Sequence, residues 1–100
     1  MDISAFRQSL QAAEPPSPLS LPLQALWWDA KGDWDRAHEC AQAEPGPPGE
    51  AVHAYLHRKE PDPGNARYWY NRAGRPAATG SLDQEWDALA AELLGRQVPT

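Results

Sequence analysis

Prolines and glycines gathered in three clusters are the feature that most restricts how this chain of 100 residues can fold. The clusters are EPPSP at residues 14–18, PGPPG at 45–49 and PDPG at 61–64. Proline fixes φ and lacks a backbone N–H, so it interrupts helices and central strands alike. Regular elements are therefore confined to the short segments between these clusters.

Those segments have the periodicity of helices and lack that of strands. No segment alternates between apolar and polar residues over the length of a strand. The chain has only five β-branched residues, which are Ile3, Val52, Thr79, Val98 and Thr100. Because such residues are enriched in sheets, their scarcity predicts an all-α fold.

Apolar residues recur at helical spacing in about six segments, whose limits follow from capping residues and helix breakers. We expect terminal helices over 4–13 and 82–94, the second ended by Gly95, and inner helices over about 21–31, 34–44, 50–60 and 65–73. Short turns join the inner helices into two hairpins, 21–44 and 50–74, of a single domain, 1–100. The helix over 21–31 is apolar all round and is expected at the centre, with Trp28 and Trp69 on inner faces.

Composition excludes several functional classes. A formal net charge of −5 argues against an extended nucleic-acid surface, which needs clustered lysine and arginine. The single Cys40 cannot form an internal disulfide and is typical of a reducing compartment. The start of the chain lacks the order of a signal peptide, and no apolar run approaches the ~20 residues that cross a bilayer. The sequence therefore predicts a soluble, cytoplasmic protein, either a monomer or a weak homodimer, that binds no membrane.

Both hairpins carry small and aromatic residues at characteristic positions. In the first these are Trp28, Gly32 and Ala37, and in the second they are Ala66, Trp69, Tyr70, Arg72 and Ala73. In these positions residues 21–74 resemble the tetratricopeptide and Sel-like helical repeats, where small residues let helices approach and aromatic residues fill the space between hairpins. Ala37 and Ala66 lie 29 residues apart, against about 34 in tetratricopeptide repeats, so the resemblance implies one degenerate pair of hairpins. Residues 53–74 also resemble part of a group of small bacterial proteins of unassigned function.

The segment 53–74 also holds a candidate metal site. His53 and His57 lie one helical turn apart, which is the spacing of a two-histidine site, and Glu60 follows on the same side. A third ligand could come from Glu60, from His38 or from another acidic residue. The order HExxH is absent, because Ala54 stands where the general base of a zinc protease would be. Histidines on a partly exposed helix more often hydrogen-bond to neighbours, so we expect no bound metal or other cofactor.

A basic block is the second candidate site. It consists of Arg58, Lys59, Arg67, Arg72 and Arg75. Free N–H groups at Gly64 and Asn65, at the expected start of a helix, favour an anion, although Asp62 at the same end opposes one. The alternative is that these cations pair with Asp83, Asp87 and the acidic segment 29–50. Tyr68 points away from the inner face beside Arg72, as in an aromatic–cation pair of a contact surface.

The sequence favours a small helical protein-interaction or adaptor domain whose partner is another protein or an acidic peptide. Enzymatic activity is not favoured, because the chain has no paired nucleophile and base and no glycine-rich phosphate loop. The alternative is a protein that binds a small molecule, an anion or a metal, possibly as an enzyme, through the helix carrying His53, His57 and Arg58. Convergence of these side chains in one place favours the second class, and splaying over a convex surface favours the first.

Overall fold

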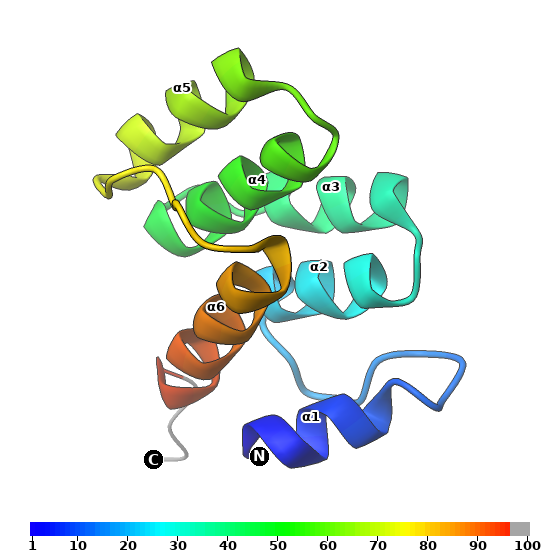
Figure 1. The fold of residues 1–100 in the computed structure, drawn as a ribbon. Helices are drawn as coiled ribbons and strands as arrows, with labels where there is room; N and C mark the ends of the chain where they lie inside the picture. The colour runs from blue at the N-terminus through cyan, green and yellow to red at the C-terminus, as the bar shows by residue number, and fades with distance from the viewer. Residues whose placement is uncertain (97–100) are drawn as a thin grey trace.

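The computed structural model describes residues 1–96 and contains six α-helices and no strand within that range (Figure 1). The helices are α1 (Ile3–Ser9), α2 (Leu21–Ala30), α3 (Trp34–Gln42), α4 (Pro47–Lys59), α5 (Pro63–Ala73) and α6 (Leu82–Arg96). None of these helices is both long and apolar enough to cross a membrane. The predicted all-α fold is confirmed.

Helix α4 lies at the centre of the fold and packs against α2, α3, α5 and α6 (Figure 1). Residues 51–57 are buried without interruption, with Ala51 in the main core and Ala54 in a small cluster with Ala66 and Tyr70 of α5. The prediction gave the central place to α2. That helix contacts α3, α4 and α6, whereas α4 contacts α5 as well as α2, α3 and α6.

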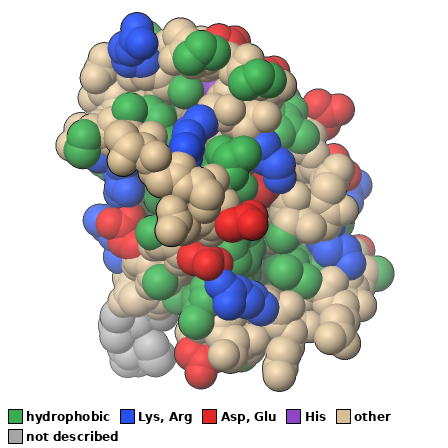
Figure 2. All heavy atoms as spheres, viewed as in Figure 1, with side chains coloured by type: hydrophobic (Ala, Val, Ile, Leu, Met, Phe, Trp, Pro, Cys, Tyr) green, Lys and Arg blue, Asp and Glu red, His purple; other side chains and the backbone are tan. Residues whose placement is uncertain are grey.

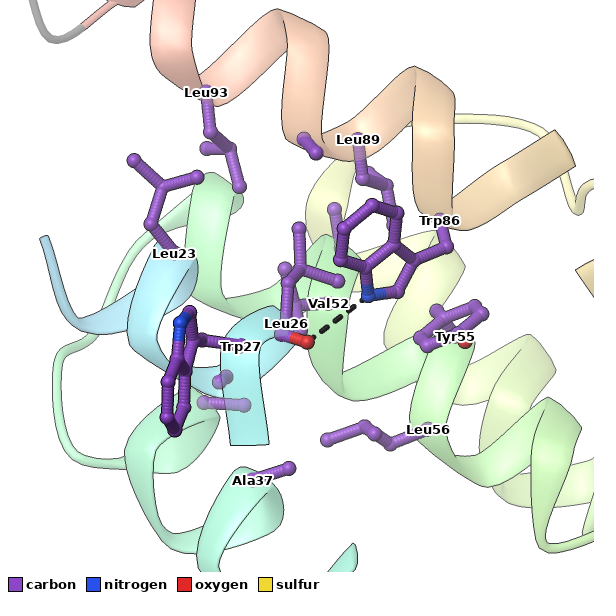
Figure 3. Close-up of a cluster of buried hydrophobic side chains, with 14 of the residues drawn as sticks. Leu23, Leu26, Trp27, Ala37, Val52, Tyr55, Leu56, Trp86, Leu89 and Leu93 are labelled. Atoms are coloured by element: carbon purple, nitrogen blue, oxygen red, sulfur yellow. Dashed lines mark hydrogen bonds between the residues drawn. The ribbon is translucent and has the colours of Figure 1, made fainter. Parts of the chain in front are cut away.

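The main core lies between α2, α4 and α6 (Figure 3), and α1 contributes Phe6 to it. Its largest fully buried side chains are Trp27, Phe6, Leu23, Leu26, Leu56 and Val52. The indole N–H of Trp86 donates a 2.9 Å hydrogen bond to the carbonyl of Leu26, which fixes α6 against α2 (Figure 3). The ring of Phe6 stacks on that of Trp86 at 5.7 Å between centroids, so α1 is anchored through α6.

Two tryptophans lie elsewhere than predicted. Trp27, not Trp28, fills the core, while Trp28 is half-buried with the guanidinium of Arg36 4.3 Å from its ring centroid. Trp69 is also half-buried, although Ala66 on the same helix is buried as expected. Adjacent residues of a helix point about 100° apart, and periodicity cannot rank them when both flanks are apolar.

Two helices begin earlier than predicted because prolines occupy their first turns. Helix α4 starts at Pro47 rather than residue 50, and α5 starts at Pro63 rather than Asn65. The first N–H groups of a helix have no partner within it, so proline is tolerated there. The carboxylate of Asp62 caps α5 by accepting a 3.2 Å hydrogen bond from the N–H of Asn65.

Helix ends also differ from the prediction. Helix α1 ends at Ser9, where the ammonium of Lys31 donates hydrogen bonds to the carbonyls of Leu10 and Ala12 at 2.6 and 3.0 Å and holds the turn that follows. Helix α6 continues through Gly95, which was expected to stop it. A glycine ends a helix only where the chain adopts a left-handed conformation, as it does at Gly74 with φ 72°.

The difference between the adjacent tryptophans gives a stability prediction. Trp27→Ala should lower the free energy of unfolding by about 3–5 kcal/mol, because it leaves a large cavity in the core. Trp28→Ala is the matched control and should cost clearly less, since that side chain is already partly exposed. Urea unfolding monitored by circular dichroism measures both values. Equal losses would contradict the assignment of Trp27 as the core residue.

Candidate metal centre

All three histidines of the chain converge at the interface of α3 and α4. His38 comes from α3, and His53 and His57 come from successive turns of α4. One ring nitrogen from each lies within 4.8 Å of the others. The ring centroids of His38 lie 4.5 Å from His53 and 5.2 Å from His57, and the last two are 4.8 Å apart. The i, i+4 spacing on α4 and the packing of α3 on α4 together produce this convergence.

Two of the three rings are buried. The exposed fraction is 4% for His53 and 7% for His57, and His38 is half-buried. The prediction of a partly exposed helix is therefore wrong at this point. It failed because α3 and α5 both cover the face of α4 that carries the histidines.

Two tryptophans form walls of the histidine cluster. The indole of Trp34 stacks on His38 at 4.9 Å between centroids and 13° between planes. Its N–H donates a 2.9 Å hydrogen bond to the carbonyl of Leu56, which fixes the ring against α4. From the other side, Trp69 of α5 stacks on His53 at 3.9 Å and 17°. The cluster is thus bounded by flat apolar surfaces that hold the imidazole rings in place.

Among residues 1–96, only one of the three imidazoles forms a hydrogen bond. The Nδ1 atom of His57 lies 2.8 Å from a carboxylate oxygen of Glu60, which favours the tautomer with its proton on Nδ1 and leaves the Nε2 lone pair available. The ring nitrogens of His38 and His53 form no hydrogen bond with any residue in the described part of the chain. Within the described range no buried side-chain nitrogen or oxygen lacks a partner, so the unbonded ring nitrogens of His38 and His53 reach solvent and are accessible to a ligand.

Burial also favours the neutral form of two of these rings, His38 and His53. It lowers the pKa of His53 from 6.5 to about 4, because the interior disfavours the imidazolium and because His38 and His57 lie nearby. Burial lowers the pKa of His38 as well, with a further contribution from His57. Neutral imidazole is the form that binds metal ions, so His38 and His53 are in the ligating state at neutral pH.

A second group of possible ligands adjoins the first and shares His57. It consists of His57, Glu60 and Asp62, with one ligand atom of each within 4.8 Å of the others. The carboxylate of Asp62, however, already accepts hydrogen bonds from the backbone N–H and the side-chain amide of Asn65 at 3.2 and 3.0 Å. This carboxylate occupies the start of α5, where the sequence placed an anion at Gly64 and Asn65. In the second group, Asp62 therefore caps α5, and Glu60 orients the ring of His57.

The basic block is mostly neutralised within the fold. The ion pairs are Arg58–Glu85 at 2.9 Å, Lys59–Asp29 at 2.9 Å, Arg72–Glu50 at 3.2 Å and Arg75–Glu92 at 2.9 Å. Figure 2 shows the result on one face, where positive and negative side chains are interspersed. Of the five cations in the block, only Arg67 lacks a carboxylate partner among residues 1–96. Arg58 pairs with α6 and also donates to the carbonyl of Gly80, so it does not join the histidines.

Sequence reasoning identified His53, His57 and Glu60 and named His38 as a possible third ligand, but it missed the aromatic walls. The available signal was the i, i+4 spacing of Trp34 and His38, which places both on one face of α3. The contact between Trp69 and His53 had no local signal, because it depends on how α5 lies on α4.

The burial of His53 gives a pH prediction for protein freed of metal by EDTA. The titratable groups that face it are His38 and His57. Because its folded pKa of about 4 lies below the unfolded value of about 6.5, the unfolded state binds more protons between these values. Stability should be full above pH 6.5 and fall by about 3 kcal/mol as the pH approaches 4.

Urea unfolding at several pH values between 7 and 4 measures this loss. His53→Phe keeps an aromatic ring against Trp69 but cannot be protonated, so its acid loss should be smaller than that of the parent. Parallel curves for the two proteins would show that His53 is not the group responsible.

Comparison with known proteins finds no protein family whose model matches, no similar curated protein and no similar solved structure. The function of the histidine cluster must therefore be argued from its own geometry.

Proposed function

We propose that the protein binds a divalent transition-metal ion, with His38, His53 and His57 as the protein ligands. The observation that carries this proposal is the approach of three ring nitrogens to within 4.8 Å, two of them on imidazoles with no hydrogen bond among the described residues. Around zinc, with Zn–N distances near 2.0–2.1 Å, tetrahedral ligands lie about 3.3 Å apart. Zinc binding therefore requires the three nitrogens, which lie within 4.8 Å of one another, to move closer together.

The ligand chemistry favours one class of ion. Imidazole nitrogen suits zinc, copper, nickel and cobalt, whereas magnesium and calcium prefer oxygen ligands. No cysteine belongs to the cluster in the described part of the chain, so the thiolate ligands that favour copper(I) are absent from it. Three protein ligands also leave a coordination position for Glu60, for water or for a small molecule.

Glu60 is suited to an outer role. A carboxylate that accepts the Nδ1 proton of a ligating histidine fixes the ring orientation and raises the basicity of the other nitrogen. Its contact with His57 at 2.8 Å has this arrangement. Since the Glu60 side chain is largely exposed, replacing it should affect the metal more than the fold.

A protein-interaction domain is the second candidate function. It is supported by Tyr68, which is 52% exposed on the outer face of α5, and by the neighbouring Arg67, which has no ion-pair partner in the range 1–96. The neutralisation of most of the basic block weakens the case for an acidic partner. The metal proposal therefore has the stronger support, and an adaptor role of the tetratricopeptide type has the weaker.

Metal titration tests the first proposal. Protein without a polyhistidine tag is treated with EDTA, dialysed and melted in the presence of zinc, nickel or copper ions. An ion that binds the folded state stabilises it by RT ln(1 + [L]/Kd), about 2.7 kcal/mol at a hundredfold excess over Kd. We expect at least one ion to raise the melting temperature by several degrees.

Two variants complete this test. His38→Phe keeps a ring stacked on Trp34 and should abolish the stabilisation, and Glu60→Gln should weaken metal affinity by about 10- to 100-fold. Magnesium at the same concentration is the control ion and should have no effect. If no ion stabilises the parent, or if His38→Phe is stabilised equally, the three-histidine site does not bind metal.

The second candidate is tested by reversing charge on α5. The double variant Arg67→Glu with Arg72→Glu should keep the fold, because both side chains are exposed and an exposed ion pair such as that between Arg72 and Glu50 contributes little to stability. It should, however, recover less of any acidic partner in an affinity capture from source lysate. Recovery of the same proteins in the same amounts by both versions would remove this face as a binding surface.

A further inference from the structure

Helix α5 packs mainly on α4, and Tyr70 also forms a hydrogen bond to Glu85 of α6. Its two buried residues, Ala66 and Tyr70, form a small cluster with Ala54 of α4 that is separate from the main core. Segments with few buried apolar contacts open locally at a lower free energy than the core does. We therefore expect α5, which is docked on α4, to open locally while the main core stays intact.

One of the contacts that dock α5 involves a proposed metal ligand. The indole of Trp69 lies on the imidazole of His53 at 3.9 Å and nearly parallel to it. When an imidazole coordinates a divalent ion, it gains positive charge, and a cation is attracted to the face of an indole ring. The stack is therefore stronger when His53 holds a metal than when it is neutral and free.

Other contacts of α5 do not touch the histidines. The hydroxyl of Tyr70 donates to Glu85 of α6, and Arg72 pairs with Glu50 of α4. The Tyr70 contact lies away from the histidines, whereas the guanidinium of Arg72 also lies 5.5 Å from the centroid of the Trp69 ring. The part of its docking energy that depends on metal comes through Trp69.

We infer that metal occupancy of the three-histidine cluster controls how firmly α5 is docked, through the stack of Trp69 on His53. This inference rests on the proposed metal-binding function and adds the structural change that metal binding would cause. The outer face of α5, with Arg67, Tyr68 and Arg72, is held in place more of the time in the metal-bound protein. Because coupling between two sites is reciprocal, docking of α5 also raises the affinity for the metal by the same factor.

Hydrogen exchange measures this coupling directly. Amide exchange is followed by NMR or mass spectrometry in EDTA-treated protein and in protein saturated with the ion that binds most tightly. Amides of α5 that exchange by local opening should slow by about two- to tenfold, which corresponds to a cation–π contribution of roughly 0.5–1.4 kcal/mol. Helix α1 is the internal control, because it too packs mainly on one helix, α6, but lies outside the histidine cluster. Its locally exchanging amides should not slow.

The variant Trp69→Leu separates the two proposals. It keeps an apolar side chain on α5 and removes the aromatic face. We expect it to bind the metal, with affinity lowered by the same factor, and to show no metal-dependent slowing of α5. Metal binding without selective slowing of α5 in the parent protein overturns this inference and leaves the metal site standing. If calorimetry detects no metal binding, both fail. Should Trp69→Leu not fold, the comparison of α5 with α1 in the parent protein decides alone.

Discussion

The burial of α4 on nearly all sides is the constraint on which the rest of the structure depends. Helices α2, α3, α5 and α6 pack around α4, whose small residues Ala51 and Ala54 are both buried. A chain of this size can bury only a modest core, and placing one helix at its centre gives four others a surface to cover. The same arrangement carries His53 and His57 into the interior. The candidate site therefore follows from the architecture of the fold and not from a surface groove added to it.

Such a centre is not purely apolar. Besides the histidines, α4 contributes Tyr55, whose hydroxyl donates a 2.7 Å hydrogen bond to the buried carboxylate of Asp29, which also accepts from Lys59. That group is fully satisfied within the fold, as buried charges must be. The histidine cluster differs, because two of its rings have no such partners in the described range. The unbonded ring nitrogens reach solvent and are accessible to a ligand, and this contrast with Asp29 is the main structural reason for assigning a ligand to the histidines.

Much of the fold could be predicted from local signals. Breakers and caps such as Gly74 and Ser20 act within a few residues, so the number of helices and their rough limits were readable from the sequence. The choice between Trp27 and Trp28 was not, because it depends on which helix packs on which flank. The candidate site could be predicted from the sequence only in part. The spacing of His53 and His57 is local, whereas the approach of His38 depends on the packing of α3 on α4, and no alternation of residue types encodes that packing.

The two tryptophans that wall the cluster have an optical consequence. Trp34 and Trp69 lie against different imidazoles, one on α3 and the other on α5, whereas Trp27 and Trp86 belong to the main core. Indole emission is sensitive to the charge and the paramagnetism of nearby groups. A copper(II) ion seated among the histidines would quench the emission of the two wall residues before that of the core residues. Replacing Trp34 or Trp69 in turn would therefore show how much of the quenching comes from each residue, with no added fluorescent label.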